Sequence, residues 1–154
     1  MESRLSSSMD KGQPVDEAPT LQARTISNIS EVKPNEWDSC AGNTNPFVSH
    51  TFLRALEESG SCTSQTGWLP QHILLEQNDG DLLGAIPLYL KNHSQGEYVF
   101  DHGWAQALEN AGGSYYPKLQ SSVPFTPATG PRLLVSPGDS AKEKMLLLIN
   151  ASVQ

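Results

Sequence analysis

The chain has 154 residues, the length of a single domain, and its 10 Lys and Arg against 17 Asp and Glu give a formal net charge of −7. No stretch groups even three basic residues, so we expect no binding to DNA or RNA through a basic surface. The longest apolar runs fall far short of the roughly 20 residues that a membrane-spanning helix needs, so we expect a soluble protein without a membrane partner.

The N-terminal residues 1–23 carry no periodic apolar pattern, which predicts a disordered arm ahead of a domain over residues 24–154. Arg4, Lys11 and neighbouring serines resemble an organelle transit peptide, but the arm also holds acids such as Asp10, which such peptides avoid. The cytoplasm and an organelle matrix, plastids included, therefore both stay open. Without an apolar leader segment we do not expect secretion.

The first expected elements are a strand and a short helix. Residues 25–29 alternate loosely between polar and apolar, which is typical of a half-buried strand. Pro34 suits the first position of a helix, and Trp37, Cys40 and Ala41 then fall three and four residues apart on one face.

A second helix has clear boundary signals. Ser49 is a good N-cap residue, and Val48 and Leu53 are spaced for the hydrophobic contact that often flanks such a cap. Gly60 is a typical residue after the last helical turn. The sequence therefore predicts a capped helix between Ser49 and Gly60.

The middle of the chain predicts a β-hairpin, in which residues 71–76 and 81–90 are apolar-rich runs joined by a turn that contains Gly80. Residues 98–100 are expected to form a short strand and residues 104–111 one or two helical turns.

The C-terminal part begins with a loop, because residues 123–131 hold three prolines and a glycine. Residues 132–135 are expected to form a brief strand. Ser140 and Glu143 have the spacing of a capping box, which predicts a final helix. This helix is apolar nearly all round and needs partners on more than one face, so we expect a truncated domain whose exposed C-terminal helix can self-associate.

Common catalytic motifs are absent at their characteristic spacings. The two cysteines, Cys40 and Cys62, are too few for a disulfide framework, and the four histidines lack metal-site spacing, so no metal site is expected. The segment 97–104 is denser in polar and aromatic residues: Asp101 and His102, with Trp104, could hold a polar substrate in a cleft. Asp101 could equally cap a following helix.

Tyr115, Tyr116 and Lys118 form a second aromatic and cationic group, which core packing with a surface lysine also explains. We expect a substrate cleft formed by six residues, in which Asp101 or His102 is the polar hook and Arg132 clamps a carboxylate or phosphate. Its expected members are Asp101, His102, Trp104, Tyr116, Lys118 and Arg132.

Six phrases of unusual composition together resemble the FemAB-like family of the GNAT acyltransferase superfamily, which is associated with peptidoglycan biosynthesis or recognition. They are residues 45–50, 67–72, 87–91, 97–104, 115–120 and 123–132. The resemblance implies an α/β acyl-CoA N-acyltransferase fold with a mixed sheet and flanking helices, of which this chain is only the N-terminal part.

The resemblance also implies an activity for full-length relatives. Such enzymes transfer an acyl group from acyl-CoA, or an aminoacyl group from tRNA in the Fem branch, to the amine of a small molecule or peptide. They bind the pyrophosphate of CoA on a glycine-rich loop at a helix N-terminus. The corresponding residues 136–140 here hold one glycine, Pro137 and Asp139, so we expect no cofactor for this chain and no catalysis by it alone. A non-enzymatic binding or regulatory domain that retains the substrate cleft is the alternative.

Overall fold

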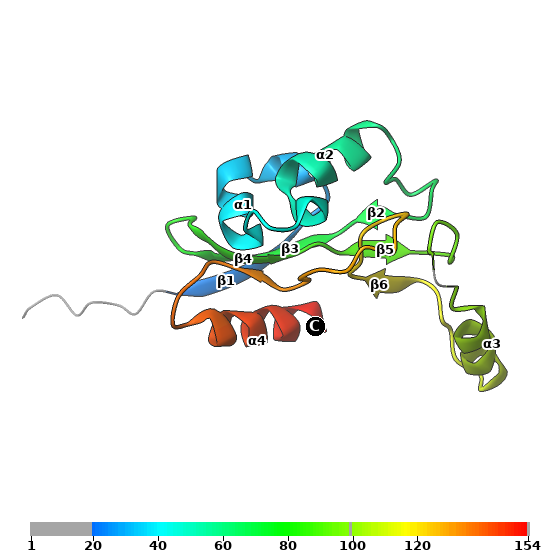
Figure 1. The fold of residues 1–154 in the computed structure, drawn as a ribbon. Helices are drawn as coiled ribbons and strands as arrows, with labels where there is room; N and C mark the ends of the chain where they lie inside the picture. Colours follow the sequence, from blue (N-terminus) through cyan, green and yellow to red (C-terminus); the bar gives the residue numbers. More distant parts are fainter. Residues whose placement is uncertain (1–19, 99, 154) are drawn as a thin grey trace, which may run out of the picture.

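The computed structural model describes residues 20–98 and 100–153. They form an α/β fold of two sheets and four α-helices, which confirms the expected α/β class with flanking helices and agrees with a partial acyltransferase-like fold (Figure 1). The expected mixed sheet is not found in these residues, because all their strand pairings are antiparallel. In this part of the chain, no helix combines the length and the apolar character needed to cross a membrane.

The larger sheet has the strand order β1-β3-β4-β7, and every pairing in it is antiparallel. Its strands are β1 (Leu21–Ile26), β3 (His72–Gln77), β4 (Leu82–Ile86) and β7 (Leu134–Val135). The smaller sheet has the order β2-β5-β6, again antiparallel. Its strands are β2 (Leu69–Pro70), β5 (Tyr89–Lys91) and β6 (Lys118–Gln120).

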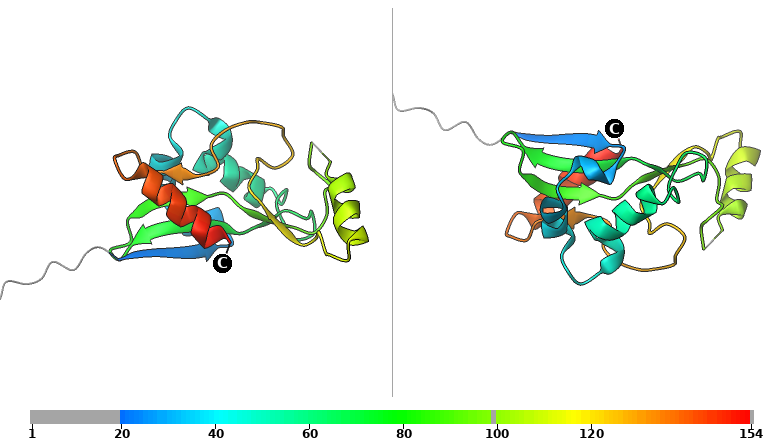
Figure 2. Two further views of the ribbon diagram at one scale, coloured as in Figure 1. Left: turned by 90° about the horizontal axis from the view of Figure 1, so that it is seen from below. Right: turned by 90° about the horizontal axis from the view of Figure 1, so that it is seen from above.

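Helices cover both faces of the larger sheet (Figures 1 and 2). One face carries α1 (Pro34–Ala41) and α2 (His50–Glu58) with two short 3-10 turns, η1 (Ile29–Glu31) and η2 (Pro46–Val48). The opposite face carries α4 (Ala141–Ser152). The alternation of side chains along the strands fills both layers, because neighbouring residues of a strand point to opposite faces.

The layer under α1 and α2 is centred on Trp37, which is fully buried and whose indole N–H donates to the carbonyl of Val48 at 2.8 Å. Leu74 of β3 and Ala85 of β4 belong to the same core cluster. This is the apolar face of α1 that the spacing of Trp37, Cys40 and Ala41 predicts.

The layer under α4 depends on a glycine of the sheet. Leu148, which is fully buried, packs against Ile73 and Leu75 of β3. A Cβ atom on Gly84 would lie only 2.9 Å from Cδ1 of Leu148 and 3.0 Å from the carbonyl oxygen of Leu134. The absence of a side chain at Gly84 therefore permits the close approach of α4.

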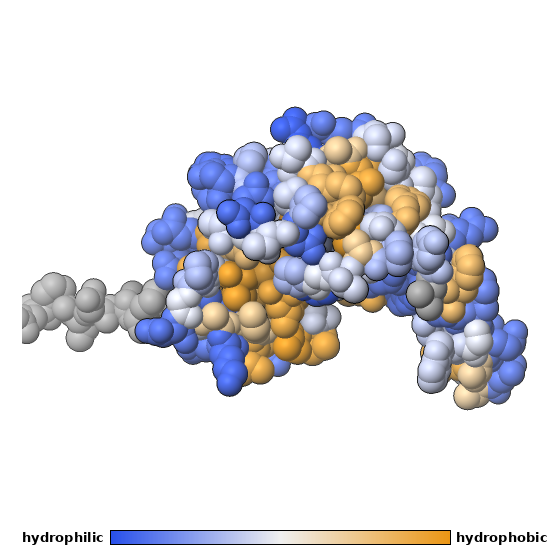
Figure 3. Space-filling model, viewed as in Figure 1, coloured by the Kyte–Doolittle hydropathy of each residue, from blue (hydrophilic) through white to orange (hydrophobic). Residues whose placement is uncertain are grey.

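The outer side of α4 is apolar and exposed, and Figure 3 shows apolar surface over this helix. Leu146, Ile149 and Val153 are 61%, 43% and 79% exposed. The expectation that this helix is poorly covered is confirmed on that side only. Self-association through it stays a prediction.

A buried polar pair joins α2 to the sheet. Oε1 of Glu57 lies 3.0 Å from Nε2 of His72, and Oε2 accepts the N–H of Ile29 at 2.8 Å. Nδ1 of His72 accepts the backbone N–H of Leu88 at 3.1 Å, so the hydrogen-bond network assigns the ring proton to Nε2, which donates to Glu57. Glu57 thus ties together η1, α2 and β3.

Several boundaries of the N-terminal half are as expected. Pro34 begins α1, the side chain of Ser49 caps α2, and Gly60 with its φ of +74° follows the end of α2. The first strand, however, begins at Leu21, before the expected domain boundary at residue 24, and ends at Ile26. The strand stops there because Asn28 forms a capping box that starts η1. Residues 1–19 of the expected arm lie outside the described residues.

The hairpin is confirmed, since Ile73 pairs with Ile86 and Leu75 with Gly84. Its second run is divided, however, because Pro87 has no N–H to donate to a ladder, and the chain passes from β4 into β5 of the other sheet.

The prediction of a strand over residues 98–100 is wrong for Tyr98 and Phe100, which are exposed loop residues. The residue between them lies outside the described ranges. Helix α3 (His102–Asn110) confirms the predicted helical turns and projects from the body of the protein (Figure 1).

The last expected strand is shorter than predicted, and the last helix begins without the predicted cap. The strand expected from residue 132 is only β7, which begins at Leu134. The capping box at Ser140 was wrong: the residue has φ −86° and ψ 9° rather than an extended conformation, and its side chain makes no capping hydrogen bond.

Glu57→Gln is expected to lower the free energy of unfolding by about 2–3 kcal/mol, because the two donors contact different carboxylate oxygens and the amide NH₂ of Gln would face one of them. Urea unfolding measures this loss. Glu58→Gln on the exposed side of the same helix is the matched control and should change stability by less than about 0.5 kcal/mol. Equal effects of the two substitutions would contradict the role assigned to the Glu57–His72 pair.

Candidate functional site

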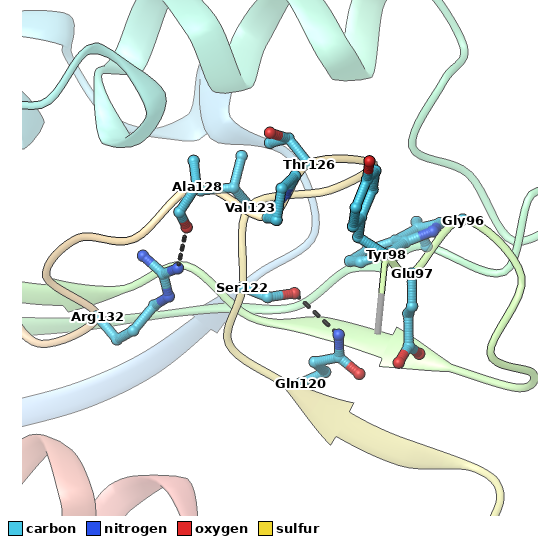
Figure 4. A pocket seen from close by; sticks show the side chains of 11 residues that line it. Gly96, Glu97, Tyr98, Gln120, Ser122, Val123, Thr126, Ala128 and Arg132 are labelled. Atoms are coloured by element: carbon cyan, nitrogen blue, oxygen red, sulfur yellow. Dashed lines mark hydrogen bonds between the residues drawn. The ribbon is translucent and has the colours of Figure 1, made fainter. Parts of the chain in front are cut away.

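A small pocket lies beside the smaller sheet, between the turn that follows β5 and the loop between β6 and β7 (Figure 4). Its cavity volume is about 220 Å³. The two walls carry opposite charges, with Arg132 on one side and Glu97 on the other. Trp68, Gln120 and Ser122 also line it.

The guanidinium of Arg132 is held by backbone carbonyls. It donates to the carbonyl oxygen of Ala128 at 3.0 Å and to those of Gly130 and Pro131 at 3.3 and 3.2 Å. Burial lowers the pKa of Arg132, and within the described ranges no carboxylate lies at ion-pair distance from it. A cation held only by neutral groups at the edge of a pocket is suited to receive an anion.

The opposite wall is built by a buried lysine. Lys91, the last residue of β5, is 0% exposed; its Nζ donates to the carbonyl of Gln95 at 3.0 Å and lies 3.6 Å from the ring centre of Trp68. Oε1 of Glu97 is 3.8 Å from the same Nζ and 3.6 Å from Nζ of Lys118. Burial lowers the pKa of Lys91 to about 8, against the opposing effect of the Glu97 charge.

Two buried polar atoms at this wall have no hydrogen-bond partner in the structure. They are Oε1 of Glu97 and the indole Nε1 of Trp68, an acceptor and a donor on side chains that both line the pocket. Oε1 of Glu97 is compensated by the charges of Lys91 and Lys118, whereas the indole N–H of Trp68 has no partner among the described residues, which costs free energy.

One lining position of the pocket, residue 96, requires a glycine. Gly96 has a φ of +79°, and a Cβ atom there would lie 2.6 Å from the ring of Phe125 and 2.7 Å from Nε1 of Trp68. Phe125 itself has a φ of +60° and packs on Trp68 with 5.4 Å between ring centres. Asn45 donates to the carbonyl of Thr129 at 2.9 Å, which ties the same loop to the start of η2.

Asp101 shares Lys118 with Glu97 and accepts hydrogen bonds from three side chains. Its carboxylate accepts from the hydroxyls of Tyr115 and Tyr116, both at 2.9 Å, and from the ammonium of Lys118. Burial would raise the pKa of Asp101, but the hydrogen bonds from Lys118 and the two tyrosines outweigh it and hold the pKa at about 2. Asp101 therefore orders the chain around β6.

The structure brings three of the six expected cleft residues together: Asp101, Tyr116 and Lys118. Nδ1 of His102 instead lies 3.2 Å from Oγ of Ser94, and its ring stacks on Phe100. Trp104 is 76% exposed on α3. Arg132 lines the pocket together with Glu97, whereas His102 is not among its lining residues.

Arg132 is the one lining residue of the pocket that belongs to the predicted cleft; Glu97 and Trp68 are among those that the sequence did not single out. Glu97 began the dense segment 97–104, but the signal there was the adjacent Asp101 and His102. The turn after β5 offered a usable signal, because a lysine inside an apolar strand requires an anion nearby.

The described residues contain no group of three or more His, Cys, Asp or Glu side chains placed to hold a metal ion. Charged, polar and aromatic side chains line the pocket.

The fold and the site define an α/β domain with a small, charged pocket. Residues 28–154 match the family model of the FemAB-like proteins, described as peptidoglycan biosynthesis/recognition, and the chain belongs to this family. Comparisons with curated proteins and with solved structures gave no significant match.

Asp101→Asn is expected to lower the free energy of unfolding at pH 6 by about 2 kcal/mol and to have little effect near pH 2. The pKa of the folded state lies below the ordinary value of 3.8, so the carboxylate stabilises the fold above pH 4, and this contribution is lost as the pH falls toward 2. Urea unfolding at several pH values tests this. Glu109→Gln on exposed α3 is the control; a pH-independent effect of Asp101→Asn would refute the assignment.

Proposed function

We propose that the chain forms the acceptor side of an N-acyltransferase of the GNAT superfamily, and that it corresponds to the N-terminal part of such a domain. In the reaction, the nitrogen of an amine attacks the carbonyl carbon of an acyl thioester or aminoacyl ester. The C–N bond forms, the C–S or C–O bond breaks, and the proton lost by the amine ends on the leaving group or solvent. Membership of the FemAB-like family, the α/β fold and the pocket support this proposal.

The observation that carries the proposal is the charge arrangement around Glu97. An amine must be neutral to act as a nucleophile, and nearby cations disfavour its protonated form. Lys91 and Lys118 flank Glu97. Glu97 can accept a hydrogen bond from the amine and so orient it while these cations favour the neutral form.

The size of the pocket supports an acceptor rather than the donor as ligand. Its cavity volume of about 220 Å³ equals the liquid volume of about seven water molecules. Pockets for drug-sized ligands measure about 300–1,000 Å³. The pocket thus suits a small amine and is too small for a nucleotide cofactor.

The donor site is weak in this chain. Residues 136–140 precede α4, and Asp139 is exposed there, where its charge would repel a pyrophosphate. Pro137 removes one backbone donor. We therefore propose that the chain binds no acyl-CoA and catalyses no transfer by itself. A binding or regulatory domain that keeps the acceptor pocket is the second candidate, and the same two features favour it.

Titration with a small primary amine, L-alaninamide, is expected to shift the indole N–H signal of Trp68 in a ¹⁵N–¹H correlation spectrum. The reason is that Trp68 lines the pocket and its indole N–H, which has no partner among the described residues, lies against Gly96 of the same lining. The signals of Trp37, which bonds the Val48 carbonyl, and of exposed Trp104 should stay in place.

Ala128→Phe fills the pocket and should abolish the shift, whereas Ala111→Phe, on an exposed turn, should leave it unchanged. Absence of a shift at millimolar amine, or an equal shift in the filled variant, would refute an acceptor site here.

Isothermal titration with CoA at low salt is expected to show no micromolar binding, because screening is least there and any phosphate contact would be strongest. Two cations lie near this helix end: Lys142 in the first turn of α4, and Lys144, whose ammonium donates to the hydroxyl of Ser136 in the same loop at 2.8 Å. Micromolar binding that Lys142→Glu abolishes, and that Lys33→Glu at the N-cap of α1 leaves intact, would demonstrate a working cofactor site and overturn the proposal.

A further inference from the structure

The second charged wall of the pocket has no role in holding an amine. Arg132 faces the cavity opposite Glu97, and its guanidinium contacts only backbone carbonyls of its own loop (Figure 4). A planar guanidinium presents parallel N–H groups that match the two oxygens of a carboxylate. The acceptor amine therefore needs an anionic group of its own to use this wall.

The charges near the pocket indicate which anion fits. Three cationic side chains, Lys91, Lys118 and Arg132, stand against the two carboxylates Glu97 and Asp101, which leaves one net positive charge in a chain whose total is −7. One carboxylate would neutralise this excess. A phosphate dianion would leave the pocket with uncompensated negative charge.

Neutral polar side chains also line the pocket. The hydroxyl of Ser122 lies 2.9 Å from the amide nitrogen of Gln120, and both side chains belong to the lining. Thr126 adds a second hydroxyl to it. Because a hydroxyl can turn to donate, these groups can bond a ligand oxygen once one is present.

We infer that the pocket recognises a small α-amino acid, or a ligand end of that chemistry, with its carboxylate on Arg132 and its amine on Glu97. This inference rests on the proposed function for the amine and adds the carboxylate as the group that selects the substrate. The cavity volume of about 220 Å³ limits the side chain of such a ligand to a small one.

Three ligands test the two halves separately, with the Trp68 indole signal as readout. They are L-alanine, which has both groups, L-alaninamide, which lacks the carboxylate, and N-acetyl-L-alanine, which lacks the basic amine. Alanine is expected to bind at least about tenfold more tightly than alaninamide, the typical effect of a hydrogen-bonded charge pair. Equal affinities of these two would overturn the inference and leave the amine site standing.

N-acetylalanine distinguishes this failure from that of the proposed function. Weaker binding than that of alanine supports both assignments. Binding as tight as that of alanine would leave the carboxylate site standing and refute the amine site. Inorganic phosphate is the competitor: displacement of alanine at equal concentrations would show a general anion site and overturn the selection for a carboxylate.

Arg132→Gln should remove the advantage of alanine over alaninamide while the affinity for alaninamide stays within about twofold. Arg132→Lys keeps the charge but loses the planar fork, so it should restore only part of the advantage. Arg54→Gln, at an exposed ion pair on α2, is the matched control and should change neither affinity. An advantage of alanine that persists in Arg132→Gln would refute the role of this residue.

Discussion

The pocket depends on the burial of a single ammonium group. Lys91 ends β5 inside the protein, and a charge removed from water is stable only with close partners. Its Nζ donates a hydrogen bond to the Gln95 carbonyl, lies over the Trp68 ring and forms an ion pair with the Glu97 carboxylate. These contacts shape the turn after β5 and thereby present Glu97 to the cavity. The electrostatics of one strand end, rather than the apolar core, thus fix the wall at which an amine would bind.

Elements with local boundary chemistry could be predicted from the sequence. Pro34, Ser49 and the turn at Gly80 each act on backbone within a few residues, so their effect survives the rest of the fold. Ser140 looked equally clear, but the conformation of the preceding turn keeps it out of capping geometry. Pro87 was visible as well; what the sequence could not indicate is that the chain there leaves one sheet for another.

The candidate site was less predictable, because its residues come from distant segments. Arg132 could be named as an anion clamp, since it is a lone cation after a proline-rich loop. Its counterpart Glu97 and the indole of Trp68 meet it only through the pairing of β5 with β2 and β6. For Asp101, the sequence drew attention to the adjacent His102. In the structure, three residues further along the chain donate to its carboxylate instead.

The glycine beneath α4 links two positions that no sequence motif connects. Because a methyl group on Gly84 would collide with Leu148, the two residues share one fixed volume between helix and sheet. A side chain at position 84 would also lie 3.0 Å from the backbone carbonyl oxygen of Leu134, and a smaller residue at position 148 would not relieve that contact. Related sequences should therefore keep glycine at position 84, whatever apolar residue faces it from the helix.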